Sequence, residues 1–380
     1  MKKGWKTKKL GELCDILDSQ RKPITKRDRT SGEYPYYGAT GIVDYVGDFI
    51  FDEPLVLVGE DGAKWASGEN TAFHVEGKCW VNNHAHVLRP HRKTVLDNWL
   101  VYHLNHSDLT EFVSGLTVPK LNQGNLREIP IPVPPLAEQQ RIVGVLDEAF
   151  AGLATAQANA AKNLQNARAL FESHLQSVFT QRGKGWVEKT LEEVSTTFGR
   201  GKSKHRPRNA AHLYGGKYPF IQTGDIRNAD HIITEYSQTY SDAGLAQSKL
   251  WPKGTICITI AANIAETAIL GFDSCFPDSV IGVVANPKET DVGFIEYLLQ
   301  SFKARIQALG QGAAQANINM GTFENERFPF PPVAEQKQIV AKLDALATET
   351  QRLARHYQQK QAALAALKKS LLHDAFRGAL

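Results

Sequence analysis

Apolar and polar positions along this chain follow two rhythms, one typical of strands and one typical of helices, and the whole succession occurs twice. Short apolar or alternating runs broken by Gly, Asp and Asn predict strands at 49–59, 72–88, 255–261 and 280–284. A helix is expected after each group of strands, at about 95–114 and at 293–309. The pattern therefore predicts two β-rich domains, each followed by helix.

A double proline then opens a long helix in each repeat. Proline disfavours helix in the residue before it but suits the first helical turn, so the helices are expected to start at about Leu136 and at Val333. Apolar residues recur in heptads in both: Leu146, Leu153, Ala160 and Ala167 in the first, and Leu343, Tyr357, Leu364 and Leu371, with Leu346, Leu353 and Leu367, in the second. At ~1.5 Å per residue each forms a rod on the order of 65 Å. Packing the two rods against each other, antiparallel, would bury both stripes; a coiled-coil dimerisation segment is the alternative.

Sequence identity confirms that the two repeats share an origin. PPLAEQQRIVGVLDE, from Pro134, and PPVAEQKQIVAKLDA, from Pro331, agree at nine of fifteen positions with an offset of 197, which is held from Pro90 and Pro287 onward. Trp5 and Trp186 are offset by 181, so the second repeat carries about sixteen extra residues (197 − 181). We expect these to form a surface loop before its middle, because loops tolerate insertions.

The predicted fold is α+β, with two β-rich domains related by an approximate two-fold axis and separated by two long antiparallel helices that form a coiled coil. The predicted boundaries are 1–133 and 185–330 for the domains, and 134–184 and 331–380 for the helical spacers. The formal net charge of +4 is small, so an acidic partner must meet local basic patches. The four scattered cysteines, the lack of an apolar leader and the lack of a membrane span predict a cytoplasmic protein with no disulfide framework or zinc site.

The strongest charge feature is the run from Phe198 to Lys217, which contains no acidic residue. Its candidate DNA-binding cations are Arg200, Lys202, Lys204, Arg206 and Arg208. Such a loop suits phosphate contacts, and Arg or Lys at its tip could read guanine edges in the major groove. A solvated basic loop is the alternative, but the run overlaps the expected insertion, which favours a function.

Two polar loops at matching positions precede the double prolines. Asn and Gln can pair with adenine, and these loops supply the candidates Lys120, Asn122, Gln123, Asn125, Gln315, Asn317 and Asn319. Asn122 and Asn319 could equally serve to form turns. Tyr37 and Gln222 complete the candidate DNA-binding set.

Several motifs for other chemistry are incomplete in this sequence or occur in only one repeat. Gly201-Lys202-Ser203 lacks the earlier glycine of a phosphate-binding loop, since Thr196 holds that position. His84 and His86 share a strand face but have no counterpart histidines in the second repeat, so hydrogen bonding or packing is favoured over metal binding. Asp61, Glu76 and Lys78 loosely resemble a magnesium-dependent nuclease site, with no equivalent in the second repeat. Adenine-methyltransferase motifs are also missing.

At this point the sequence resembles a known family. The motifs YPYYGATGIVDY (34–45), VNNHAHVLRP (81–90), KLNQGNL (120–126) and PPLAEQQRIV (134–143) are similar to those of the specificity (S) subunits of type I restriction–modification systems. The resemblance implies that two target-recognition domains each read one half of a bipartite, asymmetric site in double-stranded DNA. It also implies that the helices set the spacer and dock two methyltransferase (M) subunits, with restriction (R) subunits in the full complex.

The same resemblance implies that this chain catalyses nothing and holds no cofactor or metal. S-adenosylmethionine, ATP and magnesium would be used by the partner subunits. A stand-alone DNA-binding or structural adaptor is the main alternative, and a magnesium-dependent nuclease is the second. The recognised bases, the spacer length and the groove that each loop enters do not follow from the sequence.

Overall fold

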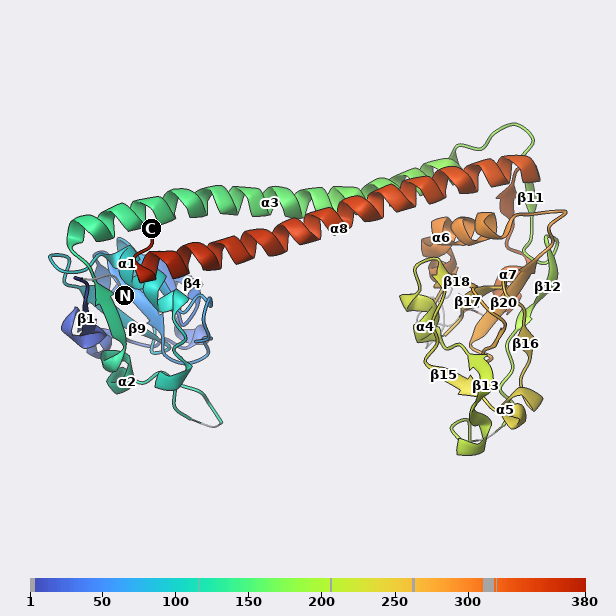
Figure 1. The fold of residues 1–380 in the computed structure, drawn as a ribbon. Coiled ribbons are helices and arrows are strands. Elements are labelled where there is room, and N and C mark those ends of the chain that lie inside the picture. Colours follow the sequence, from blue (N-terminus) through green and yellow to red (C-terminus); the bar gives the residue numbers. More distant parts are fainter. Residues whose placement is uncertain (1–3, 116, 206, 262–263, 310–317, 319) are drawn as a thin grey trace. The chain divides into compact units, whose positions relative to one another are not determined.

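The computed structural model describes residues 4–380 except 116, 206, 262–263, 310–317 and 319. The chain divides into two compact units. The first unit is formed by 1–162 and 357–380, and the second by 163–356. Each unit thus contains one β-rich domain together with one end of each of the two long helices (Figure 1).

The first unit contains two four-stranded sheets and a small two-stranded sheet. The sheet orders are β2-β9-β6-β7, β4-β3-β8-β5 and β1-β10. The strands are β1 Lys6–Lys9, β2 Cys14–Ile16, β3 Ser31–Gly38, β4 Gly41–Val46, β5 Phe51–Asp52, β6 Leu55–Gly59, β7 Ala72–Val75, β8 Lys78–Val81, β9 Ala85–Pro90 and β10 Pro130–Val133. The helices are α1 Asp97–His106, α2 Gln123–Glu128 and the start of α3 Leu136–Thr180.

The second unit repeats this plan with additions. Its sheet orders are β12-β20-β17-β18-β14, β15-β13-β19-β16 and β11-β21. The strands are β11 Val187–Lys189, β12 Ser195–Arg200, β13 Tyr214–Phe220, β14 Ile232–Ile233, β15 Gln238–Tyr240, β16 Leu250–Trp251, β17 Ile256–Thr259, β18 Thr267–Leu270, β19 Ser274–Cys275, β20 Val280–Ala285 and β21 Phe328–Phe330. The helices are α4 Thr223–Asn228, α5 Asp242–Ala246, α6 Val292–Leu309, α7 Met320–Glu324 and the start of α8 Val333–Arg377.

The inserted segment of the second unit lies before its middle, as predicted, but it is not the surface loop that the sequence suggested. In the first unit, strands β3 and β4 are joined by the two residues Ala39 and Thr40. In the second unit the corresponding strands, β13 and β15, are separated by 221–237, which include α4 and β14. The extra chain is therefore folded rather than a loop, since Ile226 and Ile233 are buried. It also follows the basic run instead of overlapping it, so that argument for a function of the basic run was wrong.

The helix expected at 95–114 is shorter than predicted, because α1 ends at His106. Just beyond it the carboxylate of Asp108 accepts hydrogen bonds from the backbone N–H and the hydroxyl of Thr110, which gives the chain an alternative to helix. Trp99 of α1 and Phe294 of α6 occupy equivalent positions, because each packs against the first tryptophan of its repeat, Trp5 or Trp186. Their offset is 195 (294 − 99) and not the constant 197 that was expected. The helices predicted from Leu136 and Val333 begin at those residues.

Each unit is closed by the far end of the other long helix. In the first unit Phe376 of α8 packs edge-on against Trp99, with ring centroids 4.8 Å apart. In the second unit Phe179 of α3 packs on Phe294 at 5.4 Å. Since the start of α3 shares a core with the end of α8, and the start of α8 with the end of α3, the two helices run antiparallel in each unit, as predicted.

The heptad prediction holds for the first helix and partly for the second. Leu146, Leu153, Ala160 and Ala167 are all buried, and so is Leu343. Leu367, however, is 47% exposed, and its duplicate Leu170 is 52% exposed (offset 197). A leucine at this position therefore faces solvent in both units, which the heptad pattern did not predict.

A buried glutamine fixes the start of each long helix. Gln139 is fully buried; its Oε1 accepts from Leu96 N–H at 3.0 Å, and its Nε2 donates to the carbonyls of Thr94 and Pro134, both at 2.9 Å. Gln336, its duplicate, does the same in the second unit, and its Oε1 accepts from Asp291 N–H at 2.9 Å. Each amide holds the double-proline turn against the preceding domain.

Candidate nucleic-acid interface

A basic loop occupies the same topological position in both domains, between the first strand of one large sheet and the first strand of the other. In the second domain it joins β12 to β13, and in the first it joins β2 to β3. Sequence analysis identified only the second. The first, at 17–30, contains Arg21, Lys22, Lys26, Arg27 and Arg29. Alignment at an offset of about 181–184 could have found it, but the two aspartates that interrupt it hid the signal.

The basic loop of the first domain divides into anchored and exposed cations. Arg29 donates to Asp44 of β4 at 2.9 Å and lies over the Tyr36 ring at 4.4 Å. Lys22, Lys26 and Arg27 are exposed, and the Arg27 side chain is 87% exposed. The anchored residue fixes the loop against the sheet, and the exposed ones offer positive charge for phosphates.

In the second domain two predicted cations converge on one residue, Asp278. The Arg208 Nη2 donates to both carboxylate oxygens of Asp278 at 2.8 Å, and Arg200 donates to the Asp278 backbone carbonyl at 2.7 Å. Lys202 and Lys204 are exposed. Arg206 lies outside the described residues. Lys202 and Lys204 are thus the described candidates that present free charge, while Arg200 and Arg208 also shape the loop.

The polar loop of the first domain is largely a structural network. Asn122 caps α2 by accepting from the N–H of Asn125 at 2.8 Å, so the turn-forming alternative is confirmed for Asn122. Asn125 donates to the Phe112 carbonyl at 2.7 Å, and Gln123 donates to Asp18 at 3.0 Å. Lys120 pairs with Glu60 at 2.9 Å. Gln315, Asn317 and Asn319, the counterparts in the second domain, lie outside the described residues.

His86 belongs to the buried charge network beneath this loop. Its Nδ1 bonds to Asp18 at 2.6 Å and its Nε2 to the Leu121 carbonyl at 2.7 Å. Burial is the largest single effect and raises the pKa of Asp18, but the hydrogen bond and charge of His86, the Val87 N–H and the Arg21 charge together outweigh it, and the net pKa is lowered. Although the donor atoms of Asp18, Glu60 and His86 lie within 4.8 Å of one another, the Arg21 guanidinium lies 2.5 Å from Glu60 and 3.5 Å from Asp18. A cation is already in place, so hydrogen bonding is confirmed for His86.

The remaining two candidates border exposed surface. Tyr37 of β3 is half-buried, with its ring centroid 5.8 Å from that of Phe73, and burial raises its pKa. Gln222 opens α4, and its Nε2 donates to Gln238 Oε1 at 2.8 Å across the two ends of the inserted segment. Both therefore lie at the β3–β4 turn or at its counterpart.

The nuclease alternative is not supported, because the structure separates its residues. Asp61 follows β6 and Glu76 follows β7, and these strands are antiparallel with Leu55 opposite Val75. The two carboxylates thus lie beyond opposite ends of β6, which at ~3.3 Å per residue is about 13 Å long. Asp61 instead pairs with His84.

The family described as "Type I restriction modification DNA specificity domain" matches residues 2–163 and 183–361. A Haemophilus influenzae protein described as a type I restriction enzyme specificity subunit is 30% identical over 353 residues, covering 90% of this chain and 88% of its own. The EcoKI specificity subunit of Escherichia coli is 26% identical over 206 residues, covering 52% of this chain and 44% of its own.

Two solved structures share the fold. A chain from the assembly of a type I restriction–modification system matches with a TM-score of 0.77 at 20% identity, covering 100% of this chain and 99% of its own. The HsdS subunit from Thermoanaerobacter tengcongensis matches with a TM-score of 0.61 at 20% identity, covering 100% and 98%. Among the described residues, no helix combines the length and apolar character needed to span a membrane.

Proposed function

Because this chain belongs to the type I restriction–modification DNA specificity family, we propose that it reads a bipartite, asymmetric DNA site, one half with each β-rich domain. The observation that carries the proposal is the pair of basic loops at one topological position in two domains of different sequence. Equivalent loops would meet equivalent phosphates, and different surrounding side chains would read different bases.

The two long helices would set the spacer and dock two methyltransferase subunits. The duplicated exposed leucines, Leu170 and Leu367, support two equivalent docking positions, since each is an apolar side chain facing solvent at the same helical register. Val145 of α3 is also exposed, but its counterpart is Lys342, so it offers no such pair.

This chain would be the non-catalytic member of the complex. S-adenosylmethionine-dependent adenine methylation would belong to the methyltransferase subunits, and ATP- and magnesium-dependent translocation and cleavage to the restriction subunits. The separation of Asp61 from Glu76 supports a chain without a nuclease centre of its own.

Methylation mapping after domain exchange tests the proposal. Residues 186–330 are replaced by another recognition domain, the protein is expressed with its methyltransferase partner, and adenine methylation is mapped across a genome. We expect one half-site to change while the other half and the spacer stay constant. A change in both halves contradicts independent domains, and association only with proteins unrelated to methyltransferases supports the adaptor alternative.

A further inference from the structure

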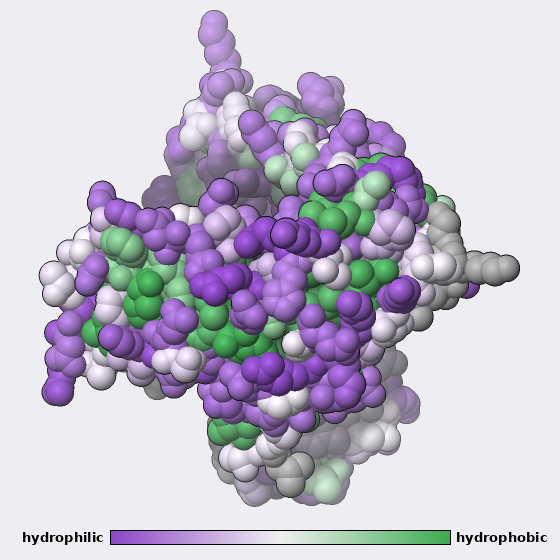
Figure 2. Space-filling view, turned by 90° about the vertical axis from the view of Figure 1, so that its left-hand side faces the viewer, coloured by the Kyte–Doolittle hydropathy of each residue, from purple (hydrophilic) through white to green (hydrophobic). Residues whose placement is uncertain are grey.

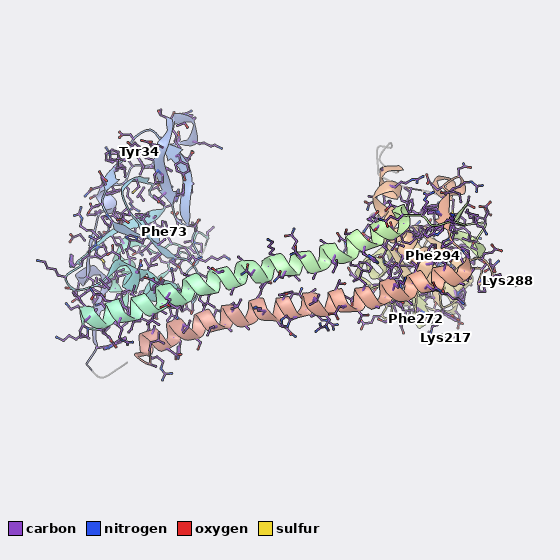
Figure 3. All side chains as sticks on the ribbon, turned by 90° about the horizontal axis from the view of Figure 1, so that it is seen from above. Tyr34, Phe73, Lys217, Phe272, Lys288 and Phe294 are labelled. Carbon is purple, nitrogen blue, oxygen red and sulfur yellow. The ribbon has the colours of Figure 1, made fainter. Side chains whose placement is uncertain are left out.

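The β3–β4 ribbon of the first domain lies at the edge of its sheet and exposes apolar side chains. The ribbon pairs Gly38 with Gly41 around a two-residue turn, and β4 is the edge strand of its sheet. Strand β8 joins β3 at Tyr36 and Tyr37, so past these residues only the Gly38–Gly41 turn has two strands alone. Figure 3 labels Tyr34 on β3 and Phe73 beside the ribbon.

Three of the six residues of β4 are large apolar side chains left in solvent. Ile42 is 48% exposed, Val43 is 53% exposed and Tyr45 is 49% exposed. A β-bulge places Val43 between the Tyr37–Ile42 and Tyr36–Asp44 pairs, without a partner of its own. Bulges re-aim side chains and are enriched beside functional sites. The space-filling view in Figure 2 shows green apolar patches divided by purple polar ones on the face turned toward the viewer.

Ile42 also borders a pocket. Its apolar lining comes from Ala72 and Phe73 on β7 and from Val101 on α1, and its polar lining includes Thr40, Asn70, His74 and Asn98. The pocket therefore places polar groups beside the apolar turn.

Exposed cations are fastened to the same ribbon. The basic loop is tied to β3 by the Ile24 N–H, which donates to the Tyr36 hydroxyl at 2.9 Å, and to β4 by the ion pair of Arg29 with Asp44. The Trp80 indole N–H donates to the Lys22 carbonyl at 2.6 Å. Exposed Lys22, Lys26 and Arg27 therefore lie on a loop that is attached to the ribbon. Positive charge beside an apolar ribbon matches a nucleic acid, which presents phosphates beside base edges, better than it matches an apolar protein surface.

The second domain differs at this very position. The two-residue turn is replaced there by 221–237, which expose Ile232 (45%) and Tyr236 (48%). Tyr236 packs edge-on against Phe272, labelled in Figure 3, at 5.2 Å. Where two copies of one domain must read different sequences, the element that differs most is the natural place for readout.

We propose that the β3–β4 ribbon enters the major groove and that Ile42 and Val43 recognise the 5-methyl groups of thymine in the first domain's half-site. The inference rests on the proposed function and names the chemistry of its readout. The major groove admits a two-stranded ribbon, and thymine alone among the bases presents a methyl group there. The first half-site thus contains at least one T·A pair that is read by apolar contact.

Deoxyuridine substitution tests this directly, because uracil keeps the pairing of thymine and lacks only the methyl group. The complex of the full chain with its methyltransferase subunits is titrated with duplexes in which each thymine of both half-sites is replaced in turn. For the unsubstituted protein we expect about fourfold weaker binding at one or two positions of the first half-site, from ~0.8 kcal/mol per apolar carbon.

Variants then assign the effect. Ile42→Ser and Val43→Ser should bind thymine and uracil duplexes equally, and both residues are exposed, so folding is preserved. Val187→Ser, at a valine that is 50% exposed in the second domain, should keep the full discrimination. Three results would overturn the inference and leave the proposed function standing. The ribbon variants could both still discriminate thymine from uracil, or they could lose methyltransferase binding and not this discrimination. The first half-site could also contain no T·A pair. If the unsubstituted complex prefers no DNA sequence, the proposed function itself fails.

Discussion

Replacing the buried glutamine at the start of either long helix should loosen one unit and spare the other. In Gln139→Leu, an apolar side chain of similar size leaves three backbone groups without this partner: the buried Pro134 carbonyl and the part-buried Leu96 N–H and Thr94 carbonyl. At ~1 kcal/mol for each group, the low end of the usual range, the loss is roughly 3 kcal/mol. Gln336→Leu removes the equivalent hydrogen bonds to Asp291, Glu289 and Pro331, so its cost should be similar.

Hydrogen exchange is the suitable assay, because a chain of two units need not unfold in a single step. A loss of roughly 3 kcal/mol corresponds to more than about a hundredfold faster exchange. The acceleration should appear in the first turns of α3 for Gln139→Leu and of α8 for Gln336→Leu. Gln140→Leu and Gln338→Leu, at exposed positions one and two residues further on, are the controls. Equal acceleration in both units, or none, would refute the role of these amides.

Three further predictions concern partner docking, pH and salt. Leu170→Glu and Leu367→Glu should each weaken the docking of one methyltransferase subunit at least about tenfold, so native mass spectrometry should detect a one-to-one complex. The control Val145→Glu should leave two subunits bound. Retention of both subunits in the leucine variants contradicts duplicated docking. Burial lowers the pKa of His103 to about 4, so the first unit should lose about 1 kcal/mol as pH falls from about 6.5 to 5.5, because only the unfolded chain takes up that proton. For His231, burial is the largest single effect and lowers the pKa, but the hydrogen bond and charge of Glu296 and the charges of Asp344 and Asp230 together outweigh it, and the net pKa is raised. Its stabilisation of the second unit is therefore complete below about pH 6.5 and is lost as pH rises above that. Exchange in α1 and α6 should respond oppositely to acid, and parallel responses would contradict this. Lys26→Ala should reduce the salt dependence of DNA binding by about one ion, whereas Asp278→Asn should increase it by freeing Arg208. Equal slopes of binding constant against salt for the two variants and the unsubstituted protein would remove both loops from the interface.

The duplication made much of the fold predictable. Pro134 and Pro331 mark helix starts that the structure reproduces, and the heptads from Leu146 to Ala167 are buried as their spacing requires. The sequence placed the insertion before the middle of the second repeat but did not identify the connection that receives it, because aligned landmarks only bound an insertion. Leu367 was misassigned because the heptad rule treats every apolar position as part of the seam.

The candidate site was less predictable, because a polar side chain looks the same in sequence whether or not it is satisfied within the protein. Asn122 and Asn125 are held by contacts within their own loop, and Lys120 pairs with Glu60, far away in sequence. Lys26 was not predicted as a DNA-binding residue, because nearby aspartates interrupt the run of positive charge around it. Ile42 and Val43 read as ordinary strand residues until their exposure was known.

The closing of each unit by the far end of a long helix has a consequence for the nascent chain. The second unit is one continuous segment, 163–356, whereas the first needs 357–380 to cover Trp99 and its neighbours with Phe376. During synthesis the domain made first must therefore wait for residues 357–380 to leave the ribosome, and the domain made second closes first. This reverses the usual amino-terminal-first order of folding. A truncation that removes only the last turn of α8 would leave the beginning of the protein, not its end, with an open core.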